Sequence, residues 1–373
     1  MAHRLAVATS ALALGFFGSA KAQTTADAPP EAVRASSWLP GSIHFSGVMD
    51  GYYSANLNHP SSRTNQLRNF DVNADQFSLN MTKVTAELPP APVGFRLDMG
   101  FGEAFDLFNG GESSSVLMRY VMQAYVSFKP AAWKGVQIDF GKHATLAGAE
   151  PSETYLNWNY SRSLLYANGP YYHFGLRSTF PVHPNISTGF SLVNGWNNIK
   201  DNNSGKTVGL HGNFKTAKIS WSHSYYTGPE QDGSLANRRH FYDTVVNVTP
   251  HGRVGCYLNF NYGTERTAGA GSNDWIGIAG AARFAANDRI AFSPRMEWYK
   301  DKDGAITGLA QELKEFTITA EWTFKPGFIT RFEFRRDWSD RPFFQRGQAP
   351  AAFEHQDTLL IGLIAFFGPR RLE

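Results

Sequence analysis

The feature that most constrains this chain is a strict alternation of apolar and polar side chains along almost its whole length. From Glu315 to Phe324, Phe, Ile, Ala and Trp residues alternate with Thr and Glu residues. Successive side chains of a β-strand point to opposite faces of the sheet, so this pattern predicts strands with one apolar and one polar face. No comparable stretch carries the 3.6-residue apolar stripe of an amphipathic helix. The chain is therefore expected to be all-β.

Sixteen stretches follow this pattern, and each is expected to form a strand. They span 43–54, 76–87, 94–102, 117–128, 135–142, 172–180, 186–193, 207–214, 219–226, 239–248, 254–263, 274–284, 289–300, 313–324, 328–338 and 357–367. Their lengths are close to the roughly 9–11 residues with which a tilted strand crosses a bilayer. In the second stretch the apolar phase changes near Lys83, which predicts a β-bulge.

The connections between these stretches alternate in length. Those after even-numbered strands are short, whereas those after odd-numbered strands are long and rich in Gly, Asn, Asp and Ser, such as 264–273 and 143–171. An up-and-down meander places the two sets at opposite ends, as in membrane barrels with short periplasmic turns and long outer loops. Lipid cannot satisfy backbone polar groups, so strands that span it must close on themselves. We therefore predict a transmembrane antiparallel up-and-down β-barrel of about 16 strands over residues 42–367.

The N-terminus has the pattern of an export signal. His3 and Arg4 precede an apolar run from Leu5 to Phe17, and Ala20-Lys21-Ala22 fits a cleavage site. The apolar run is too short for a transmembrane helix. We predict a signal peptide over 1–22, a flexible segment over 23–41 and a C-terminal tail over 368–373. The expected location is the bacterial outer membrane.

The polar faces of the predicted strands carry charges of both signs. Burying so many charges in a dry core would be prohibitive, so water is expected on that side. A barrel of about sixteen strands is wide enough for an aqueous channel. The residues predicted to line the pore are Arg96, Asp98, Arg119, Arg177, Arg295, Glu297, Arg331, Glu333 and Arg335. For any single residue, an ion pair between neighbouring strands is the alternative interpretation.

The longest connection, 143–171, contains Trp158, Tyr160 and Tyr166. A solvated loop of this length rarely carries so many aromatic residues without packing them. We predict that it folds partly into the lumen and narrows it. The residues predicted at this constriction are Asn157, Asn159, Tyr160 and Arg162. The alternative is an external loop that lies over the rim.

Composition excludes several other classes of function. Without the predicted signal peptide, 33 basic residues face 32 acidic residues, so nucleic-acid binding by a basic surface is not expected. A single cysteine, Cys256, excludes an intramolecular disulfide framework and a cysteine-rich zinc site. No catalytic or nucleotide-binding motif is present, so we expect no enzyme activity, cofactor or metal. A barrel hydrolase is disfavoured because Ser222 and Ser224 are each one residue from His223 and would face away from it.

Several short motifs occur along the chain in an order that is typical of a known protein family. They are Phe70-Asp71, Phe77-Ser-Leu-Asn80, Gly94-Phe-Arg-Leu-Asp98 with Phe101-Gly102, Gly141-Lys142 with Thr145, Gly148 and Glu150, Asn159-Tyr-Ser-Arg-Ser163, and Asn194-Gly-Trp196. In this order the chain resembles the putative β-barrel porin-2 family of bacterial outer-membrane proteins over roughly residues 40–367. The resemblance implies a porin-like barrel that passes small solutes. It implies no catalytic residues. Such barrels often end in an aromatic residue, whereas here Phe367 is followed by Gly368-Pro-Arg-Arg-Leu-Glu373.

The leading hypothesis is a channel for passive diffusion of small hydrophilic solutes through a water-filled, charged lumen. The alternative is a non-conducting outer-membrane barrel that acts as a structural or surface-interaction protein. The expected partners are the lipid bilayer, small hydrophilic solutes and the outer-membrane assembly machinery. A homo-oligomer, a trimer by analogy with porins of this size, is also expected.

Overall fold

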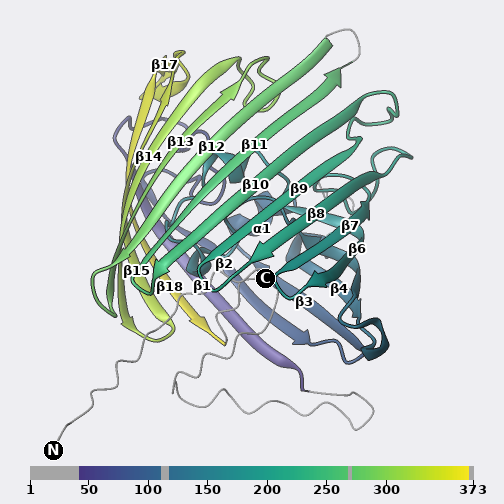
Figure 1. Ribbon diagram of the computed structural model, residues 1–373. Helices are drawn as coiled ribbons and strands as arrows, with labels where there is room; N and C mark the ends of the chain where they lie inside the picture. The colour runs from purple at the N-terminus through teal and green to yellow at the C-terminus, as the bar shows by residue number, and fades with distance from the viewer. Residues whose placement is uncertain (1–41, 111–116, 268–270, 369–373) are drawn as a thin grey trace, which may run out of the picture.

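A computed structural model describes residues 42–110, 117–267 and 271–368. Within these residues, sixteen antiparallel strands form one closed barrel in which chain neighbours pair and β1 pairs with β18 (Figure 1). The barrel strands are β1 (His44–Asn56), β2 (Gln76–Leu88), β3 (Val93–Phe101), β4 (Val121–Phe128), β5 (Gln137–Ala144), β6 (Tyr172–His183), β7 (Ile186–Val193), β8 (Thr207–Lys215), β9 (Ile219–Pro229), β10 (Arg238–His251), β11 (Val254–Thr267), β12 (Gly271–Ala285), β13 (Ile290–Asp301), β14 (Gln311–Lys325), β15 (Phe328–Ser339) and β18 (His355–Phe367). The predicted barrel class and strand number are confirmed.

The alternation in the sequence becomes an outer and an inner face of the wall. On β18 the outward Leu359 and Leu363 are 50% and 53% exposed, whereas the inward Leu360 and Ile364 are 5% and 0% exposed. The outward leucines would contact acyl chains, because a barrel in a bilayer needs an apolar outer band. The inward pair joins a cluster of buried side chains inside the barrel.

The connections mostly follow the predicted alternation, with one correction. Short turns such as 184–185 and 326–327 follow even-numbered strands. The predicted long connection at 264–273 is wrong, because β11 continues to Thr267 and β12 begins at Gly271. Thr264 and Arg266 still pair with Asp274 and Ser272. The pairing of β11 and β12 therefore continues beyond the apolar band as two polar strand ends. Residues whose composition is typical of a loop are part of the strands here.

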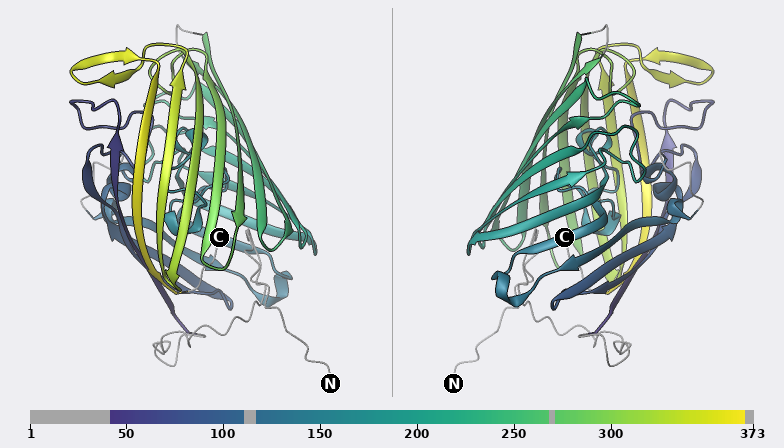
Figure 2. Two further views of the ribbon diagram at one scale, coloured as in Figure 1. Left: turned by 90° about the vertical axis from the view of Figure 1, so that its left-hand side faces the viewer. Right: turned by 90° about the vertical axis from the view of Figure 1, so that its right-hand side faces the viewer.

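Two further details differ from the sequence prediction. The bulge in β2 lies at Asn80, where Asp50 pairs with Met81 and Gly51 pairs with Leu79, rather than near Lys83. The connection after β15 contains a small hairpin, β16 (Phe344–Arg346) and β17 (Ala349–Phe353), which projects from the barrel rim (Figure 2). Strands this short carry too few residues to show a period of two.

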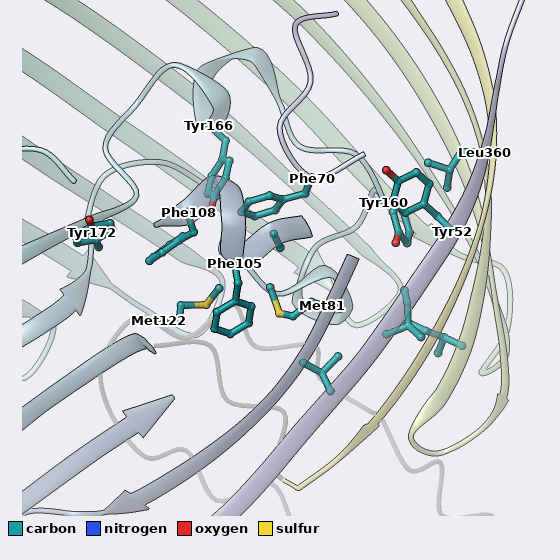
Figure 3. Close-up of a cluster of buried hydrophobic side chains, with 14 residues drawn as sticks. Tyr52, Phe70, Met81, Phe105, Phe108, Met122, Tyr160, Tyr166, Tyr172 and Leu360 are labelled. Atoms are coloured by element: carbon teal, nitrogen blue, oxygen red, sulfur yellow. The ribbon is translucent and has the colours of Figure 1, made fainter. Parts of the chain in front are cut away.

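The helical elements are short. They are α1 (Glu103–Phe108), η1 (Met118–Tyr120), η2 (Ala131–Trp133), η3 (Thr154–Leu156) and α2 (Leu164–Ala167). None of the helices in the described residues is long and apolar enough to span a bilayer. Helix α1 contacts β2, β3 and β4. Its residues Phe105 and Phe108 join Phe70, Tyr166 and Tyr172 in a buried aromatic cluster that ties three connections together (Figure 3).

Candidate functional site

The loop 145–171 between β5 and β6 contacts the inner wall of the barrel at strands far away in the sequence. The amide of Tyr160 donates to the Glu333 carboxylate on β15 at 2.6 Å. The Tyr160 hydroxyl donates to Asp50 on β1 at 3.0 Å. Asn159 donates to the Ser293 carbonyl on β13 at 2.9 Å. A loop that bonds to β1, β13 and β15 at once lies inside the barrel.

Inward glycines on the wall provide the space that this loop fills. A Cβ at Gly277 on β12 would lie 2.8 Å from Leu165 Cδ1, and one at Gly255 on β11 would lie 3.1 Å from the Trp158 ring. A Cβ at Gly362 on β18 would overlap the ring of Tyr160. Heavy atoms do not pack at such separations. The absence of side chains at these three positions therefore lets the loop lie against the wall.

Arg331 on β15 binds the backbone of the loop. Its guanidinium donates to the carbonyls of Thr154 at 2.7 Å and Asn159 at 2.9 Å, and also to that of Asn157. The same group pairs with Glu321 on β14 at 2.8 Å. Arg331 is 1% exposed. A planar guanidinium with five donors can hold a carboxylate and several carbonyls together, which an ammonium group cannot do in fixed geometry.

Arg295 and Arg335 hold the next segment of the loop. Arg295 donates to the Ser161 carbonyl at 2.8 Å and pairs with the loop's Glu150 at 2.8 Å. Arg335 donates to the Arg162 carbonyl at 2.6 Å. The wall carboxylates that balance these cations include Glu297, Glu315 and Asp337. The inner faces of β13, β14 and β15 thus form a buried ion network under the loop.

The four residues predicted at a constriction all lie in this loop and are buried. Asn157, Asn159, Tyr160 and Arg162 are between 1% and 6% exposed. Asn157 and Arg162 each donate to the Pro151 carbonyl, at 2.8 Å and 3.2 Å, and so brace the loop internally. Asn159 and Tyr160 bond to the wall. In this geometry the four side chains anchor the loop rather than face open space.

A second attachment joins the loop to β2 and β3. Lys83 on β2 pairs with Asp98 on β3 at 3.0 Å and with Glu153 of the loop. Arg96 also pairs with Asp98, at 3.0 Å. Burial raises the pKa of the Glu153 carboxyl, but the charge and hydrogen bond of the adjacent Lys83 ammonium, together with the charge of Arg96, hold the pKa below its usual value.

Of the nine residues predicted to line the pore, eight are on the inner face of the wall and one is not. Arg177 on β6 pairs with Asp139 on β5 at 2.9 Å. Arg119 was expected on a strand from 117 to 128, but β4 begins at Val121 and Arg119 lies in the 3-10 turn η1. Its guanidinium pairs with Asp106 of α1, and its side chain is 56% exposed. The apolar–polar alternation of the sequence around Arg119 extends into η1, which is not part of the β-sheet.

A model of the family described as putative beta-barrel porin-2, OmpL-like, matches residues 42–367. The chain belongs to this porin-2 family. Its barrel, its outward apolar band and its polar interior are those of an outer-membrane porin fold. The resemblance seen in the order of the sequence motifs is thereby confirmed. No curated protein matches the sequence.

Solved outer-membrane proteins share the fold of this porin-2 family member at low identity. Outer-membrane expressed OmpT of Vibrio cholerae is 11% identical, with a TM-score of 0.60 over 90% of this chain and 100% of that chain. An anion-selective porin from Comamonas acidovorans is 10% identical, with a TM-score of 0.60 over 87% and 99%. A trimer form of Vibrio cholerae OmpT is 9% identical, with a TM-score of 0.57 over 87% and 99%. At such identities the likeness concerns the fold.

His223 and Ser224, which a barrel hydrolase would need on one face of the wall, have different surroundings. His223 bonds to the Tyr242 hydroxyl at 2.7 Å on the outer face of the wall. Ser224 donates to the Leu146 carbonyl at 3.1 Å inside the barrel. Serine and histidine therefore lie on opposite faces, as the spacing predicted. No set of three His, Cys, Asp or Glu side chains in the described residues is arranged to hold a metal ion.

Several residues that attach the loop are not indicated by the apolar–polar alternation of the sequence. Glu150 and Glu153 were not recognised because loop carboxylates usually face solvent, and Lys83 was assigned to a bulge. One signal was available in the sequence. Glycines at inward positions of strands, such as Gly277 and Gly362, weaken a strand unless another group approaches closely there.

Proposed function

We propose that this protein is an outer-membrane channel through which small hydrophilic solutes diffuse passively. The observation that carries the proposal is the division of the barrel interior. Loop 145–171 covers the inner faces of β13, β14 and β15, where Arg295 and Arg335 are 0% and 1% exposed. The inner faces of β7 and β8 carry half-exposed polar residues such as Ser187 and Asn213. A polar wall left uncovered beside a fixed loop supports a hydrated path of reduced width.

The experiment is single-channel recording of the purified protein in planar bilayers. We expect discrete, voltage-independent conductance steps at low potential, smaller than those of a barrel with an empty lumen. Deletion of residues 153–166 should increase the step size, because it removes the part of the loop that crosses the interior. A folded native protein that never conducts would contradict the proposal, whether or not the deletion variant conducts.

The second candidate is a non-conducting barrel with a structural or surface-interaction role. It is favoured by the extent of the buried ion network that fixes the loop to the wall. In that case the native protein would be silent, whereas the deletion of 153–166 would conduct. The pair of recordings therefore separates a narrowed channel from a plugged barrel.

We further propose that the protein forms a homo-oligomer, with a trimer as the expected state. This rests on the fold it shares with porins, one of which is described as a trimer form. Sedimentation of the detergent-solubilised protein, corrected for bound detergent, should give three copies for each particle. A monomeric mass would contradict this part of the proposal.

A further inference from the structure

A pocket opens on the inner wall of β6, β7, β8 and β9. It is lined by side chains or backbone of Leu146, Ser178, Thr179, Ser187, Thr188, Gly189, His211, Gly212, Asn213, Ser222, His223 and Ser224. Ser187, Asn213 and Ser222 point inward from three adjacent strands, because Asn213 pairs with both serines across the ladder. All three are half-exposed. The residues that line this pocket are called the neutral wall below.

The chemistry of the neutral wall differs from the rest of the interior. Its lining includes hydroxyl, amide and imidazole groups but, among the residues that the structure describes, no Asp, Glu, Lys or Arg. His211 places its two ring nitrogens 2.8 Å from the Ser191 hydroxyl and 3.4 Å from the Ser224 hydroxyl. The Asn213 side-chain oxygen is itself buried and has no hydrogen-bond partner among the described residues. The neutral polar side chains that the wall presents to the lumen are those of Ser187, Asn213 and Ser222, which are half-exposed.

The charged half of the interior is not available to a passing solute. Ser293, Thr317 and Thr319 on the inner faces of β13 and β14 are 1%, 0% and 0% exposed, because loop 145–171 lies over them. The arginines there already bond to loop carbonyls and to wall carboxylates. On the β5–β6 side, the charges of Arg177 and Asp139 are paired with each other. Charge in this half is therefore used to fix the loop, whereas the pocket on β6, β7, β8 and β9 is lined by uncharged residues.

We infer that solutes cross this barrel along the neutral wall, and that uncharged polyhydroxylated molecules such as sugars and polyols are the preferred class. Hydroxyl and amide groups can replace the water that such a solute loses on entry, hydrogen bond for hydrogen bond. They offer no opposite charge to compensate an ion for its lost hydration. This inference deepens the proposed channel function and depends on it.

Cysteine accessibility tests the path, and the chain offers a matched pair of serines. Ser222→Cys places a thiol on the neutral wall, and Ser293→Cys places one on the inner face of β13 under the loop. Both serines point inward, but Ser222 is half-exposed whereas Ser293 is 1% exposed. The native Cys256 is replaced by Ala in both variants, which removes the other thiol. The probe is a small anionic methanethiosulfonate, with labelling read by mass spectrometry and current read in planar bilayers.

We expect Ser222→Cys to be labelled quickly and to lose conductance in steps, and Ser293→Cys to stay unlabelled with its current unchanged. Current that persists after complete labelling at Ser222→Cys, or that is blocked only through Ser293→Cys, would overturn the path while leaving the channel itself intact. A native protein that carries no current would instead overturn the channel function, and the path with it. Both variants should be checked for the circular dichroism of the native barrel.

The preferred solute class is tested by uptake into liposomes of three molecules of similar size. These are glucose, the cation glucosamine and the anion gluconate. We expect glucose to enter fastest, and Ser222→Asp to shift the reversal potential toward cation preference. Uptake of either charged molecule at a rate equal to or above that of glucose would overturn the inference about solute class, even if the cysteine results support the path.

Discussion

At the scale of the residue, the arginines inside this barrel act on backbone carbonyls as well as on carboxylates. Arg331 binds three loop carbonyls and Glu321, and Arg295 binds Glu150, Glu315 and the Ser161 carbonyl. A buried guanidinium without partners would be very unfavourable, so each contact also compensates for the lost hydration of the charge. These residues couple the position of loop 145–171 to the stability of the wall.

Replacement of Arg331 by Met should release the loop. Glu321 would lose one of its cationic partners and keep the other, because Arg283 also pairs with it at 2.9 Å. Breaking a buried pair by removing one partner costs about 3–5 kcal/mol. We expect a loss of that order in the free energy of unfolding, together with larger and noisier conductance steps. Arg336→Met is the control, because Arg336 pairs with Asp357 and is 37% exposed. An equal loss of stability in the two variants would contradict the anchoring role.

The Lys83–Glu153 pair predicts a defined dependence on pH. The folded-state pKa of Glu153 is below its ordinary value, so the stabilisation is present above the unfolded pKa of about 4.3. It is lost as the pH falls through the folded-state value. We expect Glu153→Gln to lower the melting temperature at pH 7 but to have a smaller effect in acid than at neutral pH. Glu312→Gln, at an exposed pair with Lys314, should have little effect at either pH. The measurement is thermal unfolding followed by circular dichroism. An effect of Glu153→Gln on the melting temperature that is as large in acid as at neutral pH would contradict the prediction.

At the scale of the element, glycines at inward positions of the strands leave room for the loop, because they have no side chain there. On β12, a Cβ at the inward Gly277 would lie 2.7 Å from Tyr299 Cδ2 on β13 and 2.8 Å from Leu165 Cδ1 of α2, whereas Gly280 has only ordinary contact distance to Leu258. We expect Gly277→Ala to displace α2 and change the conductance, whereas Gly280→Ala should be neutral. Current recordings of the two variants, with folding checked by heat-modifiable gel mobility, provide the measurement. Identical native-like currents in both would indicate that α2 does not need this space.

At the scale of the whole molecule, the outer surface predicts how the barrel sits in lipid. Ile361 lies near the middle of the outward apolar row of β18, while Trp338 lies beside Lys314 near the polar end of the wall. A charge at the bilayer midplane of such barrels costs about 2–4 kcal/mol, and one near the interface costs about 0–1 kcal/mol. We therefore expect Ile361→Lys to lower folding stability in liposomes far more than Trp338→Lys. Urea titrations that rank the two variants in the opposite order would place the bilayer elsewhere on the barrel.

The sequence by itself determined the barrel, because a period of two decides which side chains face outward without reference to the rest of the chain. It also placed eight of the nine proposed pore residues on the inner face and indicated that aromatic residues of the loop at 143–171 pack. The signal peptide over 1–22 and the segment over 23–41 lie outside the described residues and remain predictions.

Only the tertiary structure decided which of those inward charges are covered. Tyr160 and Glu333 are separated by 173 positions in the chain, and no local pattern records their contact. An alternating strand specifies a face but not what lies against it, so Arg331 under the loop and Ser222 on the neutral wall look alike as inward polar positions. The burial of one and the exposure of the other follow from where loop 145–171 lies within the closed barrel.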